Sequence, residues 1–225
     1  MFANRYEAGL ALGEALRYHL TMNGMRRATS LQVLSIPRGG VVVGGAVAEA
    51  LGCDHDVIVV KKIGFPLQEE FAAGAMAENG EVYLNPDVVM PYGYDPQFMQ
   101  KLGFQIRKTR AQIERYIAEF RQGRQLMLAE RMVMVVDDGI ATGETVKAAV
   151  RWLKAQPAGN QPRTILVAAP VGAPHTIYEL TRLADEVICL YMPADFHAVG
   201  QFYHEFPQVD DAEVRHLLLG EPQMA

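Results

Sequence analysis

Short apolar runs alternate with longer segments of helical periodicity along this chain. The apolar run at 133–136 has no polar alternation and is too short for a helix, which is typical of a strand buried on both faces of a parallel sheet. Similar runs predict core strands at 31–36, 57–62, 132–136, 164–169 and 186–191. Helical spacing or composition predicts helices at 4–23, 40–51, 98–122, 145–156, 174–183 and 211–219. This alternation predicts an α/β fold, a doubly wound, mostly parallel sheet flanked by helices with right-handed crossovers.

Several segments depart from the alternation of strands and helices. We nevertheless expect a single domain over residues 1–225. The glycine-containing segment 63–80 is predicted to be a flexible loop, with Glu69, Glu70 and Glu78 as solvated charges. A strand-like segment at 81–84 and a turn region rich in Pro and Gly at 85–96 follow it. The helix at 98–122 looks inserted, either as part of a lid or dimer surface or as a solvated charged face. Residues 192–225 form a C-terminal tail.

Composition narrows the classes of function. Half of the 225 residues are apolar and 21% are charged, as in an ordinary globular protein. A net charge of −5 shows no basic excess, so nucleic acid is not an expected partner. The apolar stretches are shorter than the roughly 20 residues that span a bilayer and no secretion signal is visible, so we expect no membrane partner and a cytoplasmic location. Cys53 and Cys189 show no disulfide framework, and His197 and His204 lack a third ligand, so no metal-ligating side chains are assigned.

Two adjacent carboxylates, Asp137 and Asp138, follow the predicted strand at 132–136. The carboxyl ends of strands in an open α/β sheet face the ligand crevice, where two carboxylates can accept hydrogen bonds from vicinal hydroxyls. The segment 139–145 then turns with glycines and hydroxyls into a helix, whose first turn exposes unpaired N–H groups that suit a phosphate. Together these features predict a receptor for a ribose 5-phosphate unit. The alternative is an ordinary turn followed by a helix cap at Thr142.

A second anion site is predicted where the first strand ends, at Pro37, Arg38, Gly39 and Gly40. Glycine N–H groups can approach an anion closely and Arg38 adds a charged donor, so pyrophosphate is the natural ligand. The alternative is tight packing of a helix on a strand. A dinucleotide site is disfavoured because the G-x-G-x-x-G spacing is missing. Lys61 and Lys62 end the second predicted strand at the same edge, where one of them can approach the pyrophosphate while the other faces solvent.

These motifs resemble those of the type I phosphoribosyltransferases. The resemblance implies a small hood or flap beside the sheet, Mg²⁺ as cofactor, and transfer of the 5-phosphoribosyl group from phosphoribosyl pyrophosphate to a nitrogen acceptor such as a nucleobase. It assigns the ribose hydroxyls to Asp137 and Asp138, and the pyrophosphate to residues 37–40 with Lys61 and Lys62 as catalytic lysines. The residues implied at the 5-phosphate are Ala141, Thr142, Gly143, Glu144 and Thr145, and those implied at the acceptor are Asp195 and Phe196.

The sequence departs from the family pattern at two positions. Gly139 stands where the family usually has an apolar residue. Ala141 stands where purine-salvage relatives often carry a carboxylate, so a 6-oxopurine acceptor is disfavoured. Asp195 and Phe196 are also consistent with a helix cap and a core residue. We expect a homo-oligomer, most simply a dimer, and the alternative function is a regulator that binds phosphoribosyl pyrophosphate without turnover.

Overall fold

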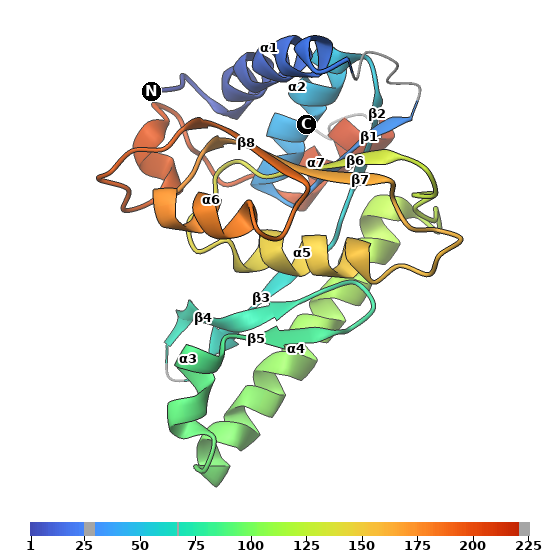
Figure 1. The fold of residues 1–225 in the computed structure, drawn as a ribbon. Helices are drawn as coiled ribbons and strands as arrows, with labels where there is room; N and C mark the ends of the chain where they lie inside the picture. The colour runs from blue at the N-terminus through green and yellow to red at the C-terminus, as the bar shows by residue number, and fades with distance from the viewer. Residues whose placement is uncertain (25–29, 67, 221–225) are drawn as a thin grey trace.

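The centre of the molecule is a five-stranded parallel sheet. The computed structural model describes residues 1–24, 30–66 and 68–220. The sheet contains β1 (Leu31–Ser35), β2 (Asp54–Val57), β6 (Met132–Val136), β7 (Thr164–Val171) and β8 (Glu186–Tyr191). Its order is β2-β1-β6-β7-β8 and every pairing is parallel (Figure 1). The predicted fold class is confirmed, and the strands at 132–136 and 186–191 have the predicted bounds.

Helices cover both faces of this sheet, which explains why its strands are apolar without alternation. On one face, α1 (Arg5–Met22) and α2 (Gly39–Leu51) pack on Met132, Met134 and Val136 of β6. On the other, α5 (Glu144–Lys154) and α6 (Pro174–Leu180) pack on Val133 and Val135. Successive side chains of one strand therefore enter different cores, and all five residues of β6 are buried.

A second unit, which we call the arm (residues 61–121), projects from the sheet domain in Figure 1. It holds an antiparallel sheet in the order β3-β4-β5. Its elements are β3 (Lys61–Phe65), β4 (Gln68–Met76), β5 (Val82–Leu84), α3 (Pro86–Val89), the 3₁₀ turn η1 (Met90–Tyr92) and α4 (Pro96–Arg121). The predicted helix at 98–122 is confirmed as α4, and the region 85–96, predicted to be turns, contains α3 and η1.

Two predictions for this region were wrong. The predicted strand at 57–62 is divided: β2 ends at Val57, β3 begins at Lys61, and residues 58–60 connect them. These three residues are buried, which explains why they look like part of a core strand in the sequence. The predicted loop at 63–80 is mostly the β3–β4 hairpin. Alanine and glycine are weak strand formers, and they occupy 72–75, where Gly74 lies close to the backbone of Tyr83 in β5.

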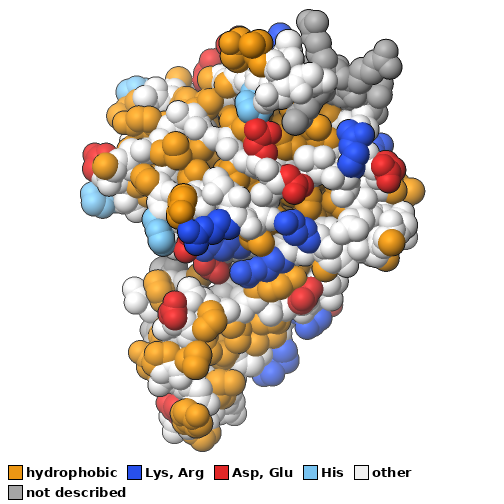
Figure 2. Space-filling model, viewed as in Figure 1, with side chains coloured by type: hydrophobic (Ala, Val, Ile, Leu, Met, Phe, Trp, Pro, Cys, Tyr) orange, Lys and Arg blue, Asp and Glu red, His pale blue; other side chains and the backbone are white. Residues whose placement is uncertain are grey.

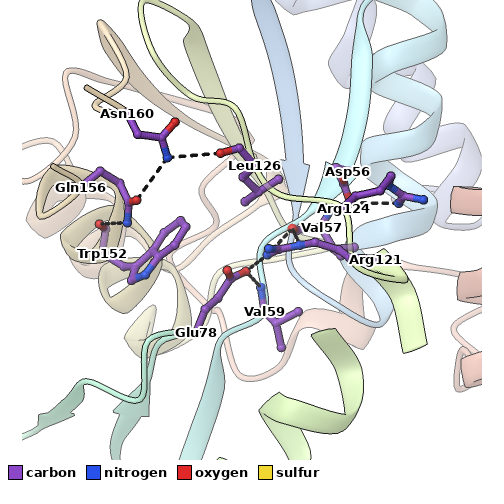
Figure 3. A network of polar contacts seen from close by, with 10 residues as sticks. All are labelled: Asp56, Val57, Val59, Glu78, Arg121, Arg124, Leu126, Trp152, Gln156 and Asn160. Atoms are coloured by element: carbon purple, nitrogen blue, oxygen red, sulfur yellow. Dashed lines mark hydrogen bonds and ion pairs between the residues drawn. The ribbon is translucent and has the colours of Figure 1, made fainter. Parts of the chain in front are cut away.

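A buried ion pair within the arm anchors it to the chain at the end of β2 through backbone hydrogen bonds. Glu78 and Arg121 contact each other with only 7% and 6% of their side chains exposed. Glu78 accepts a hydrogen bond from the Val59 N–H (2.7 Å), and Arg121 donates to the Val57 carbonyl (3.1 Å), as Figure 3 shows. The prediction that Glu78 is a solvated charge was therefore wrong, since it is the counter-ion of an arginine from α4. The side chains of Glu69 and Glu70 lie outside the described residues.

The C-terminal tail returns across the sheet domain. It contains η2 (Val199–Phe202) and α7 (Asp211–Leu219), and Val209 and Val214 are buried in the same cluster as α4 residues. The helix predicted at 211–219 is confirmed, and residues 221–225 of the predicted tail lie outside the described part. Over the described ranges, no helix has the length and apolar character needed to cross a bilayer.

Candidate functional site

The carboxyl end of β6 opens onto a cavity of about 280 Å³. Asp137 and Asp138 line it together with the loop that follows them. Side chains from distant parts of the chain complete the wall: Arg5, Lys62, Val199 and Phe206. The cavity therefore joins the strand end, the arm, the first helix and the C-terminal tail.

The two carboxylates have different surroundings. The Asp137 Oδ1 accepts a hydrogen bond from the Asp138 N–H (2.9 Å), whereas the Asp138 Oδ2 accepts one from the Arg5 Nε (2.7 Å). Burial, and then the charge of Asp138, raise the pKa of Asp137 well above its ordinary value, and Lys62 opposes this. Burial also raises the pKa of Asp138, but Arg5 counteracts it. Of the two, Asp138 is thus the carboxylate that keeps its charge more readily.

Hydrogen bonds fix the backbone of the loop that follows the carboxylates. These bonds run from the Thr176 Oγ1 to the Ala141 carbonyl (2.6 Å) and from the Ile140 N–H to the Val171 carbonyl (2.9 Å). Gly143 has a φ of 71°, a left-handed conformation that suits glycine, and α5 starts at the next residue. The first N–H groups of α5 precede the first helical hydrogen bond and lie where an anion is stabilised.

Four of the five residues predicted at the 5-phosphate line the cavity with their atoms, and the fifth has its side chain paired elsewhere. Ala141, Thr142, Gly143 and Thr145 line the cavity. The Glu144 carboxylate instead pairs with Lys147 (3.2 Å), so only its backbone is available to the loop.

The predicted pyrophosphate loop at 37–40 lies directly against the two carboxylates. A Cβ atom on Gly40 would be 3.0 Å from the Asp137 Oδ1, and one on Gly39 would collide with the Asp138 carboxylate. These glycines are therefore required for the close approach of the two loops, and the peptide bond between Pro37 and Arg38 is cis. The Arg38 side chain is not part of the described cavity lining and contacts Asp211 of α7 at 3.4 Å.

The structure distinguishes the two lysines. Lys62 lines the cavity and its charge acts on Asp137. Lys61 lies with its Nζ 4.1 Å from the centroid of the Tyr116 ring, outside the cavity. Burial, followed by the charge of Arg38, lowers the pKa of Lys61.

The two predicted acceptor residues lie away from this cavity. Phe196 stacks on Phe202 with ring centroids 5.4 Å apart. Asp195 lines a different hollow, of about 510 Å³, that also includes Phe2 and Tyr191. Their assignment to the acceptor stays a prediction, while Val199 and Phe206 are the tail residues that line the cavity beside the carboxylates.

Sequence reasoning missed Arg5 and Phe206. Arg5 pairs with Asp138, and its guanidinium carbon lies 3.6 Å from the centroid of the Phe206 ring. One signal was present: Arg5 is the first residue of α1, after the Asn4 cap, and a cation in the first turn opposes the helix dipole. The unfavourable helix position of Arg5 is consistent with its charge being used in the contact with Asp138.

Gly139 also has a structural explanation. A Cβ atom there would collide with the Val199 side chain and lie 3.1 Å from the Val171 Cγ1. The tail residue Val199 thus fills the space that a side chain at position 139 would need.

The carboxylates fit a magnesium ion bound with a phosphorylated substrate. Among the described residues, no three His, Cys, Asp or Glu side chains gather into a metal site. Magnesium, however, is commonly held by one or two carboxylates together with substrate phosphates. Asp137 and Asp138 supply such carboxylates at the wall of an open cavity.

Comparisons with known proteins agree with this geometry. The family model "Phosphoribosyl transferase domain" matches residues 22–207. Proteins of two Mycobacterium tuberculosis strains, provisionally named phosphoribosyl transferases, are each 39% identical over 215 residues, which cover 95% of this chain and 45% of theirs. The chain thus spans about half the length of these curated relatives. The crystal structure of TT1426 from Thermus thermophilus is similar over 98% of both chains, with 36% identity and a TM-score of 0.74. With the family match extending from the end of α1 to the tail that closes the cavity, the chain belongs to the phosphoribosyl transferase family.

Proposed function

We propose that this chain transfers the 5-phosphoribosyl group of phosphoribosyl pyrophosphate to a nitrogen acceptor and releases pyrophosphate. The observation that carries the proposal is the cavity itself. It combines two carboxylates suited to a sugar diol with a loop at the start of α5 suited to an anion, and the glycine loop lies directly behind the carboxylates. These three features match the diol, the 5-phosphate and the pyrophosphate of phosphoribosyl pyrophosphate. Family membership supports the same reaction class.

Each part has a role in this mechanism. Asp137 and Asp138 accept hydrogen bonds from the ribose hydroxyls, and the backbone of residues 141–145 receives the 5-phosphate. Residues 37–40 receive the pyrophosphate. Magnesium, when bound with the substrate, would supply positive charge that stabilises the departing pyrophosphate.

The chemical step breaks the bond between the anomeric carbon and the pyrophosphate oxygen, which leaves with the electron pair. The acceptor nitrogen donates its electron pair to that carbon, and its proton passes to the departing pyrophosphate. Lys62 lies on the cavity wall, and we propose that its ammonium group helps to balance the negative charge of the leaving group. The role of Lys61 is then limited to its contact with Tyr116.

The test is pyrophosphate release from phosphoribosyl pyrophosphate and Mg²⁺, screened over a panel of pyrimidine, purine and carboxylated nitrogen heterocycles. We expect release that depends on one class of acceptor and is lost in an Asp137→Asn/Asp138→Asn variant. An Arg17→Gln variant, which changes an exposed charge in α1, serves as the control. Tight binding of phosphoribosyl pyrophosphate without turnover for any acceptor would favour the regulator, and failure to bind it would overturn the proposal.

We also propose that the chain forms a homo-oligomer. Hydrophobic side chains gather on the arm in Figure 2. The arm also carries Tyr94 and Phe104, which are 100% and 58% exposed. Exposed apolar patches commonly mark interaction sites. Light scattering coupled to gel filtration should give a mass above that of one chain, and a monomer at all concentrations would contradict this.

A further inference from the structure

Arg5 is an arginine whose side chain is almost wholly removed from water. Only 10% of it is exposed, and 15% of the Asp138 side chain that it contacts at 2.7 Å. Arginine is rarely buried unless it is paired, and removing one partner of such a pair leaves the other charge uncompensated. The pair is therefore a fixed feature of the cavity wall and not a surface contact.

The guanidinium is held from three further directions. It donates to the Pro207 carbonyl at 2.6 Å, and its Cζ lies 3.6 Å from the centroid of the Phe206 ring. Its Nε would be 2.9 Å from a Cβ atom on Gly39, so the pyrophosphate loop presses on it as well. Such contacts leave the guanidinium little freedom to rotate, and its orientation is set before any ligand binds.

This arrangement fixes the Asp138 carboxylate. Arg5 bonds the Oδ2 atom of Asp138, so the Oδ1 atom is the one left to accept a hydrogen bond from another group. On the backbone of the same residue, the Tyr203 hydroxyl donates to the carbonyl at 2.6 Å. Asp138 is thus held through both its side chain and its main chain by residues that lie 133 and 65 positions away.

The groups around the two carboxylates come from distant parts of the chain. Arg5 of α1 pairs with Asp138, Lys62 of β3 acts on the neighbouring Asp137, and Tyr203 of the tail bonds the Asp138 backbone. Arg5 lowers the pKa of Asp138 against the effect of burial, which raises it. Burial also raises the pKa of Tyr203, so its hydroxyl stays a donor.

We propose that Arg5 is a positioning residue for phosphoribosyl transfer: it holds the Asp138 carboxylate oriented to accept a ribose hydroxyl, and it ties this orientation to the tail through Phe206 and Pro207. The inference rests on the proposed function. It assigns to the start of α1 a role in substrate binding, although Arg5 itself contacts the carboxylate and not the reacting atoms.

The experiment is calorimetric titration of the full chain with phosphoribosyl pyrophosphate and Mg²⁺, and separately with ribose 5-phosphate and 2-deoxyribose 5-phosphate. We expect Arg5→Met to weaken binding of phosphoribosyl pyrophosphate roughly 10- to 100-fold, the effect of losing one hydrogen bond to a charged group. The preference for ribose 5-phosphate over its 2-deoxy analogue should also fall, because the Asp138 carboxylate loses the partner that orients it. Arg5→Lys keeps a charged donor without the planar fork, so its affinity and its preference should be intermediate. Arg17→Met, an exposed arginine of the same helix, should bind like the wild type.

Circular dichroism and thermal melts establish that each variant is folded. If Arg5→Met does not fold, Arg5→Gln, whose shorter side chain lacks the guanidinium fork, should show the same fall in preference. Wild-type affinity and an unchanged preference for ribose 5-phosphate in folded Arg5→Met or Arg5→Gln would overturn the role of Arg5. A wild-type chain that does not bind phosphoribosyl pyrophosphate would instead overturn the proposed function, so the two failures are distinguishable.

Discussion

The contact between Gly139 and Val199 makes a quantitative prediction about how the tail closes the cavity. Gly139 is not among the glycines with positive φ, so its backbone accepts any L-residue. The obstacle is space, since a Cβ atom would be 2.8 Å from the Val199 Cγ2 and 3.1 Å from the Val171 Cγ1. Ordinary contacts between carbon atoms are about 3.5–4.0 Å. Gly139→Ala must therefore displace the tail or strain the strand end.

Overpacking of this kind costs about 1–3 kcal/mol of unfolding free energy. In a chain of this length, that corresponds to a fall in Tm of about 2–10 °C. Val199→Ala removes the atoms that collide, so the double variant Gly139→Ala/Val199→Ala should recover stability. We expect a coupling energy of about 1 kcal/mol or more from the double-mutant cycle, measured by urea unfolding.

Gly143 provides the matched control. A Cβ atom there would collide with the Thr176 Cγ2, and Thr176→Ser removes that methyl group while keeping the hydroxyl that donates to Ala141. The φ of Gly143 is 71°, so a strain of roughly 1–2 kcal/mol should remain in Gly143→Ala/Thr176→Ser. Strictly additive effects at Gly139 and Val199 would refute the reasoning that the tail residue takes the place of a side chain at 139.

Two further predictions concern buried charges. Burial raises the pKa of Asp137, so the native chain binds this proton more tightly than the unfolded chain does. Asp137 therefore destabilises the fold increasingly as pH rises from the ordinary carboxyl pKa through the raised one. Asp137→Asn should therefore raise the unfolding free energy at pH 8, with a smaller gain at pH 4, while ligand binding is lost; equal gains at both pH values would show that the carboxyl is not desolvated. Glu78→Gln leaves Arg121 buried without its counter-ion and should lower the unfolding free energy by about 3–5 kcal/mol, measured by urea unfolding. The control Glu81→Gln, at an exposed position, should lower it by less than about 0.5 kcal/mol. Similar losses in the two variants would contradict the anchoring role of the pair.

The parallel sheet was predictable because its strands are buried on both faces. The five apolar residues of β6 need no partner information to be recognised, and the carboxylates that follow them are placed at the ligand edge by topology alone. The confirmed part of the fold rests on this local signal.

The strands of the arm and the contact of Arg5 with Asp138 could not be predicted from local sequence in this way. The strand β4 is rich in alanine and glycine and stable only through its pairing with β3 and β5, so its local composition indicates a loop. Glu78 precedes Asn79 and Gly80, which are typical of a solvated turn, and only the fold brings Arg121 to it. Arg5 reaches Asp138 across 133 positions, a contact that no local pattern encodes.

The central claim is that Asp137 and Asp138 bind a sugar diol whose phosphate lies in the loop at 141–145. Calorimetric titration with ribose 5-phosphate, 2-deoxyribose 5-phosphate and ribose tests this without knowledge of the acceptor. Ribose 5-phosphate should bind about tenfold or more tightly than either sugar lacking one of the two groups, since a hydrogen bond to a charged group is worth about 1.5–3 kcal/mol. The preference over the deoxy sugar should vanish in Asp137→Asn/Asp138→Asn. Equal affinity for the two sugar phosphates in the wild-type chain, or binding of neither, would contradict the account.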